Sequence, residues 1–133
     1  MGGWGVIPAI RVRDMAAALA FYTDGLGFVV ERGGPADANC SLSRGDARLM
    51  LETAGDLYSA PYNEAIRSRL GSVSPNALYV EAADLEVLYA RITASGMDVV
   101  DPLADRPWGQ AEFTIADPDG QWITFWRATT SGG

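Results

Sequence analysis

Two stretches of the chain repeat one pattern of apolar positions, starting at Met15 and at Leu85. In each stretch apolar side chains fall at i, i+3, i+4 and i+7, which lines one face of an α-helix. The positions are Met15, Ala18, Leu19 and Tyr22, followed by Leu85, Leu88, Tyr89 and Ile92. Asp14 and Asp84 precede the stretches and are predicted N-caps. Glycines at 25, 27 and 96 are predicted to end the two helices.

Short apolar runs typical of β-strands surround both predicted helices, one before each helix and three after it. They cover residues 5–12, 28–30, 38–43 and 47–52, and then 77–80, 97–100, 110–116 and 121–127. The turn Asp117-Pro118-Asp119-Gly120 is a strong hairpin signal, and residues 43–46 form its counterpart. The chain is therefore predicted to be one α+β domain, 1–133, with βαβββ modules at 5–52 and 75–127. The linker, 53–74, carries a predicted short helix from about Asn63 to Leu70.

Alternation along the predicted strands separates a core face from a second face. The core face holds Val6, Ile10, Val12, Cys40, Leu42, Leu49, Leu51, Leu78, Val80, Phe113, Ile115, Ile123 and Phe125. The second face mixes large aromatic and polar side chains, as a small-molecule site does. It holds Arg11, Asn39, Ser41, Ser43, Arg48, Met50, Glu52, Tyr79, Glu81, Trp108, Gln110, Glu112, Thr114, Trp122, Thr124 and Trp126. For Trp126, packing in a core or dimer interface is an equal alternative, whereas polar neighbours favour ligand binding by Trp108 and Trp122.

The composition narrows the chemistry, because the 133 residues include no histidine and one cysteine, Cys40. Histidine is the commonest metal ligand and the usual general base near neutral pH, so its absence excludes histidine-based catalytic triads and histidine-containing metal sites. The net charge of -7 disfavours nucleic acid and would attract a cationic small molecule, although acidic surfaces more often serve solubility. No apolar run is long enough to cross a membrane, and no signal peptide is seen, so a cytoplasmic protein is expected.

Four segments carry a resemblance to a known family. Residues 6–15 (VIPAIRVRDM) and 21–28 (FYTDGLGF) resemble the opening of vicinal oxygen chelate proteins. Residues 106–113 (RPWGQAEF) and 116–123 (ADPDGQWI) resemble the closing hairpin of the same superfamily, which comprises glyoxalases, bleomycin-resistance proteins and extradiol dioxygenases. The resemblance spans about residues 5–127. It implies paired βαβββ modules forming a curved mixed sheet, usually in a homodimer with sites between modules.

The resemblance also implies four metal-ligand positions on the strands. They fall near Ile7, at Met50 or Glu52, at Pro75 or Asn76, and at Thr124. One carboxylate and one amide do not make a tight site for a divalent metal, so no metal or other cofactor is predicted. The metal-free members of the superfamily mainly sequester drugs, and Trp108 matches a position where they often place an aromatic that stacks on the ligand.

Three hypotheses follow. The first is a homodimer that binds and sequesters an antibiotic-like molecule, cationic or planar aromatic, with no catalytic residue. The second is a metal-independent isomerase, epimerase or lyase with Glu52 or Glu112 as general base; Cys40, on the core face without a histidine, is a poor nucleophile. The third is a structural or regulatory domain. For the first, the candidate ligand-binding residues are Trp108, Trp122, Trp126, Tyr79, Met50, Arg48, Glu52, Glu112, Asn39, Ser41 and Thr124, with Trp108 and Trp122 stacking on one planar group. Tyr58 and Tyr62 are either lid residues or, more commonly, packed side chains.

Overall fold

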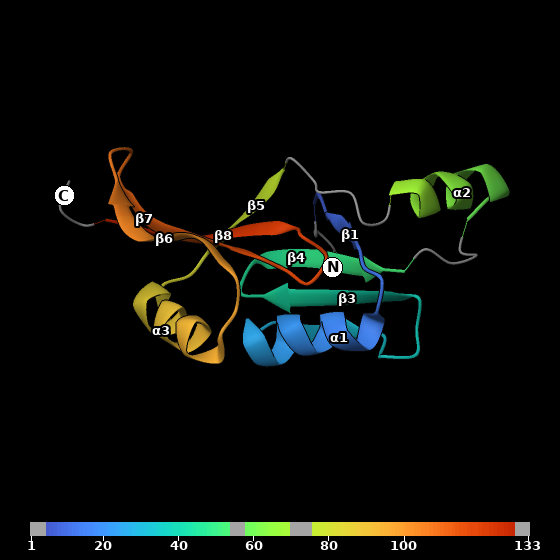
Figure 1. Ribbon diagram of the computed structural model, residues 1–133, viewed down its shortest axis with the longest axis horizontal. Helices are drawn as coiled ribbons and strands as arrows, with labels where there is room; N and C mark the ends of the chain where they lie inside the picture. Colours follow the sequence, from blue (N-terminus) through green and yellow to red (C-terminus); the bar gives the residue numbers. More distant parts are fainter. Residues whose placement is uncertain (1–4, 54–57, 70–75, 130–133) are drawn as a thin grey trace. The chain divides into compact units, whose positions relative to one another are not determined.

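The computed structural model describes residues 5–53, 58–69 and 76–129. The chain divides into two compact units, Met1–Ser72 and Val73–Gly133, and each is described here by itself. The elements of the first unit are β1 (Ala9–Arg11), α1 (Met15–Ala20), the π-helix η1 (Phe21–Gly25), β2 (Val29–Arg32), β3 (Asn39–Arg44), β4 (Ala47–Glu52) and α2 (Ala60–Arg69) (Figure 1). Its strands form one sheet in the order β1-β4-β3-β2. β1 runs parallel to β4, and the other pairs are antiparallel.

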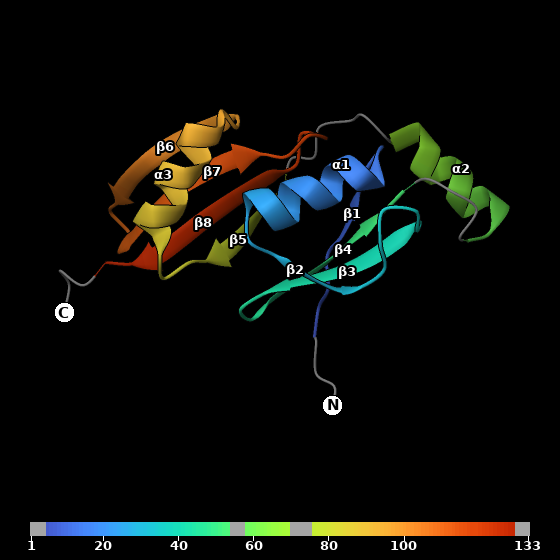
Figure 2. The ribbon, with the colours of Figure 1, turned by 90° about the horizontal axis from the view of Figure 1, so that it is seen from below.

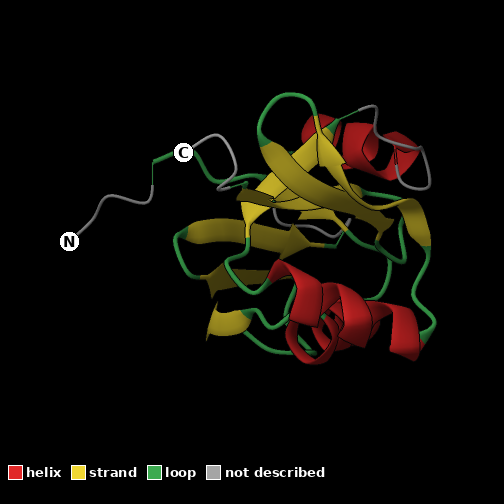
Figure 3. Cartoon of the chain, turned by 90° about the vertical axis from the view of Figure 1, so that its left-hand side faces the viewer, coloured by secondary structure: helices red, strands yellow, loops and turns green. Residues whose placement is uncertain are grey.

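The second unit repeats this arrangement. Its elements are β5 (Ala77–Glu81), α3 (Leu85–Ser95), β6 (Val99–Arg106), β7 (Gln110–Ala116) and β8 (Trp122–Ala128). The sheet order is β5-β8-β7-β6, again with the first strand parallel to the last and the other pairs antiparallel. Figure 2 shows α1 and α3 beside the strands of their own units, and Figure 3 distinguishes the helices from the strands by colour. The predicted α+β fold of two βαβββ modules is therefore confirmed.

The two predicted helix caps turn out differently. Asp14 caps α1, because its Oδ1 accepts a hydrogen bond from the Ala17 amide at 3.1 Å. Asp84 occupies the equivalent position before α3, but its side chain makes no capping hydrogen bond there, so that part of the prediction is wrong. Gly96 ends α3 in the left-handed region, with φ 80°, which a side chain would disfavour.

The cores of both units follow the predicted alternation. Cys40, Leu42 and Leu51 are fully buried in the first unit, as are Phe113 and Phe125 in the second. Ile10, Val12, Leu49, Val80, Ile115 and Ile123 are also buried. Leu78, predicted to be core, is only half-buried. In the second unit Tyr89 of α3 packs on Phe113, with ring centroids 4.9 Å apart, so the core lies between α3 and its sheet.

The element boundaries differ most from the prediction at β1, β6 and α2. Val6 was predicted to be core but is 93% exposed, because β1 begins only at Ala9. Before it, Gly5 has a positive φ, and Pro8 has no amide hydrogen to donate to a neighbouring strand. β6 continues to Arg106 with two irregularities in its pairing, where a strand over 97–100 was expected. In the linker, α2 begins at Ala60 rather than Asn63; residues 54–57 and 70–75 lie outside the described part of the chain.

None of the helices described in residues 5–53, 58–69 and 76–129 is long and apolar enough to cross a membrane.

Candidate functional site

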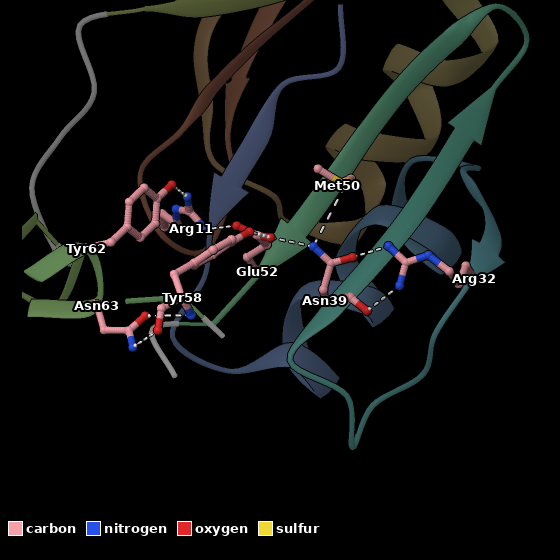
Figure 4. A network of polar contacts seen from close by, with 8 residues as sticks. All are labelled: Arg11, Arg32, Asn39, Met50, Glu52, Tyr58, Tyr62 and Asn63. Atoms are coloured by element: carbon pink, nitrogen blue, oxygen red, sulfur yellow. Dashed lines mark hydrogen bonds and ion pairs between the residues drawn. The ribbon is translucent and has the colours of Figure 1, made fainter. Parts of the chain in front are cut away.

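A buried carboxylate, Glu52, organises the polar face of the first unit (Figure 4). Glu52 ends β4, and its side chain is 2% exposed. Its Oε1 forms an ion pair with Arg11 of β1, the residue directly beside it in the parallel β1–β4 ladder. Its Oε2 accepts hydrogen bonds from Asn39 Nδ2 at 2.6 Å and from the Tyr58 hydroxyl at 2.5 Å. Both oxygens of the carboxylate are therefore engaged by groups of the protein itself.

The same network holds α2 and the residues before it. Arg11 Nη2 donates to the Tyr62 hydroxyl at 2.7 Å, and the Arg11 guanidinium lies 5.8 Å from the centre of that ring. The rings of Tyr58 and Tyr62 pack together, with centroids 4.4 Å apart. Asn63 is buried and bonds the Tyr58 backbone in both directions, at 3.1 Å and 2.9 Å. Polar contacts thus connect α2 to the strands β1 and β4.

The remaining predicted site residues of this face are engaged in similar local contacts. Asn39 accepts a hydrogen bond from Arg32 of β2 on its Oδ1, and its Nδ2 also lies 3.8 Å from the Met50 sulfur. Ser41 accepts from Arg32 at 2.9 Å and is buried. Arg48 Nη1 donates to the Gly45 and Ala47 carbonyl oxygens, at 2.7 Å and 3.0 Å. Most polar side chains of this face therefore form hydrogen bonds with one another or with the backbone.

The second unit carries a different carboxylate on the corresponding face. Glu112 of β7 is 6% exposed. Its Oε1 accepts hydrogen bonds from Trp108 Nε1 and from Gln110 Nε2, both at 3.1 Å. Trp108 lies in the turn between β6 and β7 rather than on a strand, and it is 61% exposed. Within the described residues, no arginine forms an ion pair with Glu112.

The register of the β7–β8 hairpin decides which tryptophans lie together. Trp126 lies directly opposite Glu112, so Trp126 and Trp108 both adjoin this carboxylate. Trp122 is opposite Ala116, four residues further along β7, or roughly 13 Å at the rise of a β-strand. Trp108 is therefore bonded at the Trp126 end of the hairpin, and the stacking of Trp108 and Trp122 on one planar group stays a prediction.

Two further predicted site residues lie in the middle of this face. Thr124 pairs with Thr114, and their buried hydroxyls are 2.7 Å apart. Tyr79 of β5 is beside Thr124 in the ladder and is 59% exposed. The structure therefore groups the predicted residues into two sets, one per unit. Arg11 lies on the predicted polar face of the first unit, where the sequence indicated no role for it, and Arg32 was not among the predicted residues of that face.

The residues at the implied metal positions do not fit a divalent metal. Ile7 has no donor atom, Met50 offers a thioether, and the Thr124 hydroxyl is bonded to Thr114. Glu52 is committed to Arg11, Asn39 and Tyr58, while Pro75 lies outside the described residues. In the described segments, no group of three or more cysteine, aspartate or glutamate side chains could hold a metal ion.

The single cysteine is unsuited to nucleophilic chemistry. Cys40 is fully buried, and its thiol lies 3.4 Å from the Gly34 carbonyl oxygen. Burial, with a smaller contribution from the charge of Asp37, raises the pKa of the Cys40 thiol above its ordinary value. The reactive thiolate is therefore disfavoured at neutral pH.

Duplicated βαβββ units, the second with an exposed indole held beside a buried carboxylate, define a paired-module α+β protein. The chain belongs to the Glyoxalase/Bleomycin resistance protein/Dioxygenase superfamily, whose family model matches residues 7–125.

Individual relatives agree with this assignment. The chain is 28% identical to a bleomycin resistance protein of Geobacillus stearothermophilus over 134 aligned positions, which cover 94% of this chain and 97% of that protein. It is similar in fold to TioX from Micromonospora sp. ML1, with a TM-score of 0.73 and 24% identity over 95% of this chain and 97% of TioX. It is also similar in fold to the bleomycin-binding protein of bleomycin-producing Streptomyces verticillus, solved with copper(II)-bleomycin, with a TM-score of 0.60 and 22% identity over 94% and 96% of the two chains.

Proposed function

We propose that this protein binds a planar, antibiotic-like small molecule and sequesters it without changing it and without a metal. One observation carries the proposal: the Trp108 indole is 61% exposed, yet its Nε1–H is fixed by a buried carboxylate. An exposed aromatic ring held in one orientation loses little entropy when a ligand stacks on it. The similarity to bleomycin resistance proteins supports the same function.

The side chains support binding more than catalysis. Glu52 is a poor general base, because both of its oxygens already interact with Arg11, Asn39 and Tyr58. Cys40 is buried, with a raised thiol pKa. Glu112 has no ion-pair partner among the described residues, so a metal-independent isomerase, epimerase or lyase with Glu112 as base is the second candidate function.

We further propose that the protein acts as a homodimer in the cytoplasm. Family resemblance supports the dimer, and a single free, buried cysteine suits a reducing compartment. Sedimentation velocity tests the dimer: a monomer at micromolar concentration contradicts it.

A binding screen with product analysis tests the main proposal. Planar aromatic antibiotics and, separately, bleomycin are added to the protein, and thermal unfolding and tryptophan fluorescence are followed. We expect at least one to raise the melting temperature and to quench the fluorescence, since a ligand that binds only the folded state stabilises it. The bound compound is then released and analysed by mass spectrometry. Recovery of the unchanged compound supports sequestration; a chemically altered compound overturns it in favour of the enzyme.

Matched variants locate the site. Trp108→Phe removes the indole and its hydrogen bond to Glu112, so we expect the affinity for the planar compound to fall at least tenfold. Trp122→Phe is the control, because Trp122 lies at the other end of the hairpin, opposite Ala116. Equal loss in both variants would contradict the assignment of the site to Trp108.

A further inference from the structure

The ladder registers allow the two units to be compared residue by residue. In the first unit, one row across the face consists of Arg11, Glu52 and Asn39. In the second unit, the corresponding row consists of Glu81, Trp126 and Glu112. The first row contains its own cation, and its carboxylate is neutralised by Arg11. The second row contains two carboxylates on either side of a tryptophan and no basic residue.

Two arginines that adjoin this row along the ladder or the chain, Arg106 and Arg127, form ion pairs with other residues. Arg106, at the end of β6, forms an ion pair with Asp101 at 2.6 Å. Arg127, next to Trp126 in the chain, pairs with Glu86 of α3 through its Nε at 3.1 Å and 3.0 Å. The two donors that reach Glu112, Trp108 Nε1 and Gln110 Nε2, are both neutral and share one oxygen. A carboxylate that is 6% exposed and is bonded, among the described residues, by neutral donors alone is costly to bury without a cation.

We propose that Glu112 selects ligands whose positive charge lies on the edge of the planar ring itself. This inference rests on the proposed stacking function and adds the ligand's chemical class to it. Glu112 Oε1 lies 3.1 Å from Trp108 Nε1, so the carboxylate is at the edge of the indole. A ring stacked on that indole, at a separation of roughly 3.5 Å, brings its own edge within reach of the carboxylate. A protonated ring nitrogen or amidine then pairs with Glu112, whereas a cation on a long flexible tail gains little.

Three related compounds test the geometry on the unmodified protein. 9-Aminoacridine carries its positive charge on the ring, acridone is a neutral ring of similar shape, and N-(3-aminopropyl)acridone carries its charge on a tail. Calorimetric titration should show 9-aminoacridine binding at least tenfold more tightly than acridone. The tailed compound should bind within about threefold of acridone. Equal affinities for 9-aminoacridine and acridone overturn the inference, and so does a tailed compound that binds as tightly as 9-aminoacridine.

The variant Glu112→Gln tests the residue. The glutamine oxygen can still accept from Trp108 and Gln110, so the change removes the charge and keeps both hydrogen bonds. We expect the preference for 9-aminoacridine to fall to twofold or less, with the affinity for acridone unchanged. Glu64→Gln, on an exposed residue of α2 in the other unit, changes the net charge equally and should keep the full preference. Glu81→Gln, beside Trp126 but exposed, should reduce it by less than threefold, because solvent screens this carboxylate.

The outcomes separate this inference from the proposed function. If acridone binds and Trp108→Phe abolishes its binding, the stacking function stands whatever the charge preference. A preference that survives Glu112→Gln then overturns only the role of Glu112. If none of the three compounds binds the unmodified protein, both the stacking site and the charge selection are refuted.

Discussion

Replacing Glu52 by glutamine should release α2 from the first unit without unfolding the rest of the protein. Of the described side chains of α2, only Asn63 is buried, so little apolar surface holds this helix in place. The polar contacts of α2 and of the residues before it depend on Glu52. The Tyr58 hydroxyl donates to the Glu52 carboxylate, and Tyr62 accepts from Arg11, which forms the ion pair with Glu52. Loss of the carboxylate charge therefore affects every one of these connections.

The magnitude follows from the atoms involved. A glutamine oxygen in the place of Oε2 can still accept from Asn39 and Tyr58, but its NH₂ group then faces the Arg11 guanidinium, donor against donor. Removing one partner of a buried ion pair costs about 3–5 kcal/mol. Because the Arg11 side chain is 20% exposed and recovers some hydration, we expect the lower end, about 3 kcal/mol. For a domain of this size that corresponds to a melting temperature lower by roughly 10 °C.

Hydrogen exchange read by mass spectrometry is the assay, with urea unfolding alongside. In Glu52→Gln, amides of residues 58–69 should exchange far faster than in the unmodified protein, while those of α3 stay protected. Glu64→Gln is the matched control, because it breaks an exposed ion pair with Arg67 inside α2 and should cost under about 0.5 kcal/mol. The double variant Arg11→Leu/Glu52→Leu should recover stability relative to either single change, since it leaves no unpaired charge. Unchanged stability and unchanged exchange of α2 in Glu52→Gln would refute the reasoning.

Three other changes give definite expectations. Gly33→Ala should lower the free energy of unfolding, measured by urea titration, by about 2 kcal/mol or more. Gly33 has φ +96°, and a Cβ there would lie 2.8 Å from both the Asn39 backbone oxygen and the Cys40 sulfur. Gly45→Ala is the control and should cost only about 1 kcal/mol, because the space around Gly45 is open. Thr114→Val and Thr124→Val should each cost about 1–3 kcal/mol by leaving the other buried hydroxyl unpaired, and the double variant should cost less than their sum; additive costs would argue against the bond. Burial raises the pKa of the Cys40 thiol in the folded protein, so the stability that this thiol contributes is complete below the ordinary thiol pKa and is lost as the pH rises towards the folded pKa. The free energy of unfolding of Cys40→Ala should therefore decline less at alkaline pH than that of the unmodified protein. An identical decline would contradict the raised pKa of Cys40.

The fold could be predicted from local patterns because the βαβββ repeat depends on local signals. Alternation identified buried residues such as Leu42 and Phe125, and helical spacing placed α1 and α3. The helix caps were harder to predict, since Asp14 and Asp84 stand at equivalent positions but only the Asp14 side chain makes a capping hydrogen bond. The prediction that Val6 is buried was wrong because it extended the strand back across Pro8, whereas β1 begins at Ala9.

The candidate site was harder to predict because its contacts cross between strands that are distant in sequence. The alternation put Glu52 and Glu112 on comparable faces, but only the parallel β1–β4 register brings Arg11 beside Glu52. The pairing of Trp126 with Glu112 had a usable signal, because the 117–120 turn sets the hairpin register.

The difference between the two carboxylates shows how a duplicated fold can carry separate tasks in its two units. They lie in corresponding rows of the two sheets, but Glu52 is on β4, next to the parallel first strand, whereas Glu112 is on β7, one strand further from it. The rows differ at all three positions, and the difference in net charge comes from two of them. β1 supplies Arg11 where β5 supplies Glu81, and β3 supplies Asn39 where β7 supplies Glu112. With an arginine on its first strand, the row balances its own charge and holds the chain's own helix. With a glutamate there, the row keeps an excess of negative charge around Trp126, which only a ligand or solvent can balance. The variant Glu81→Arg would therefore be expected to balance the charge of Glu112 within the second row and to lower the preference for 9-aminoacridine over acridone, while Trp108 continues to bind acridone.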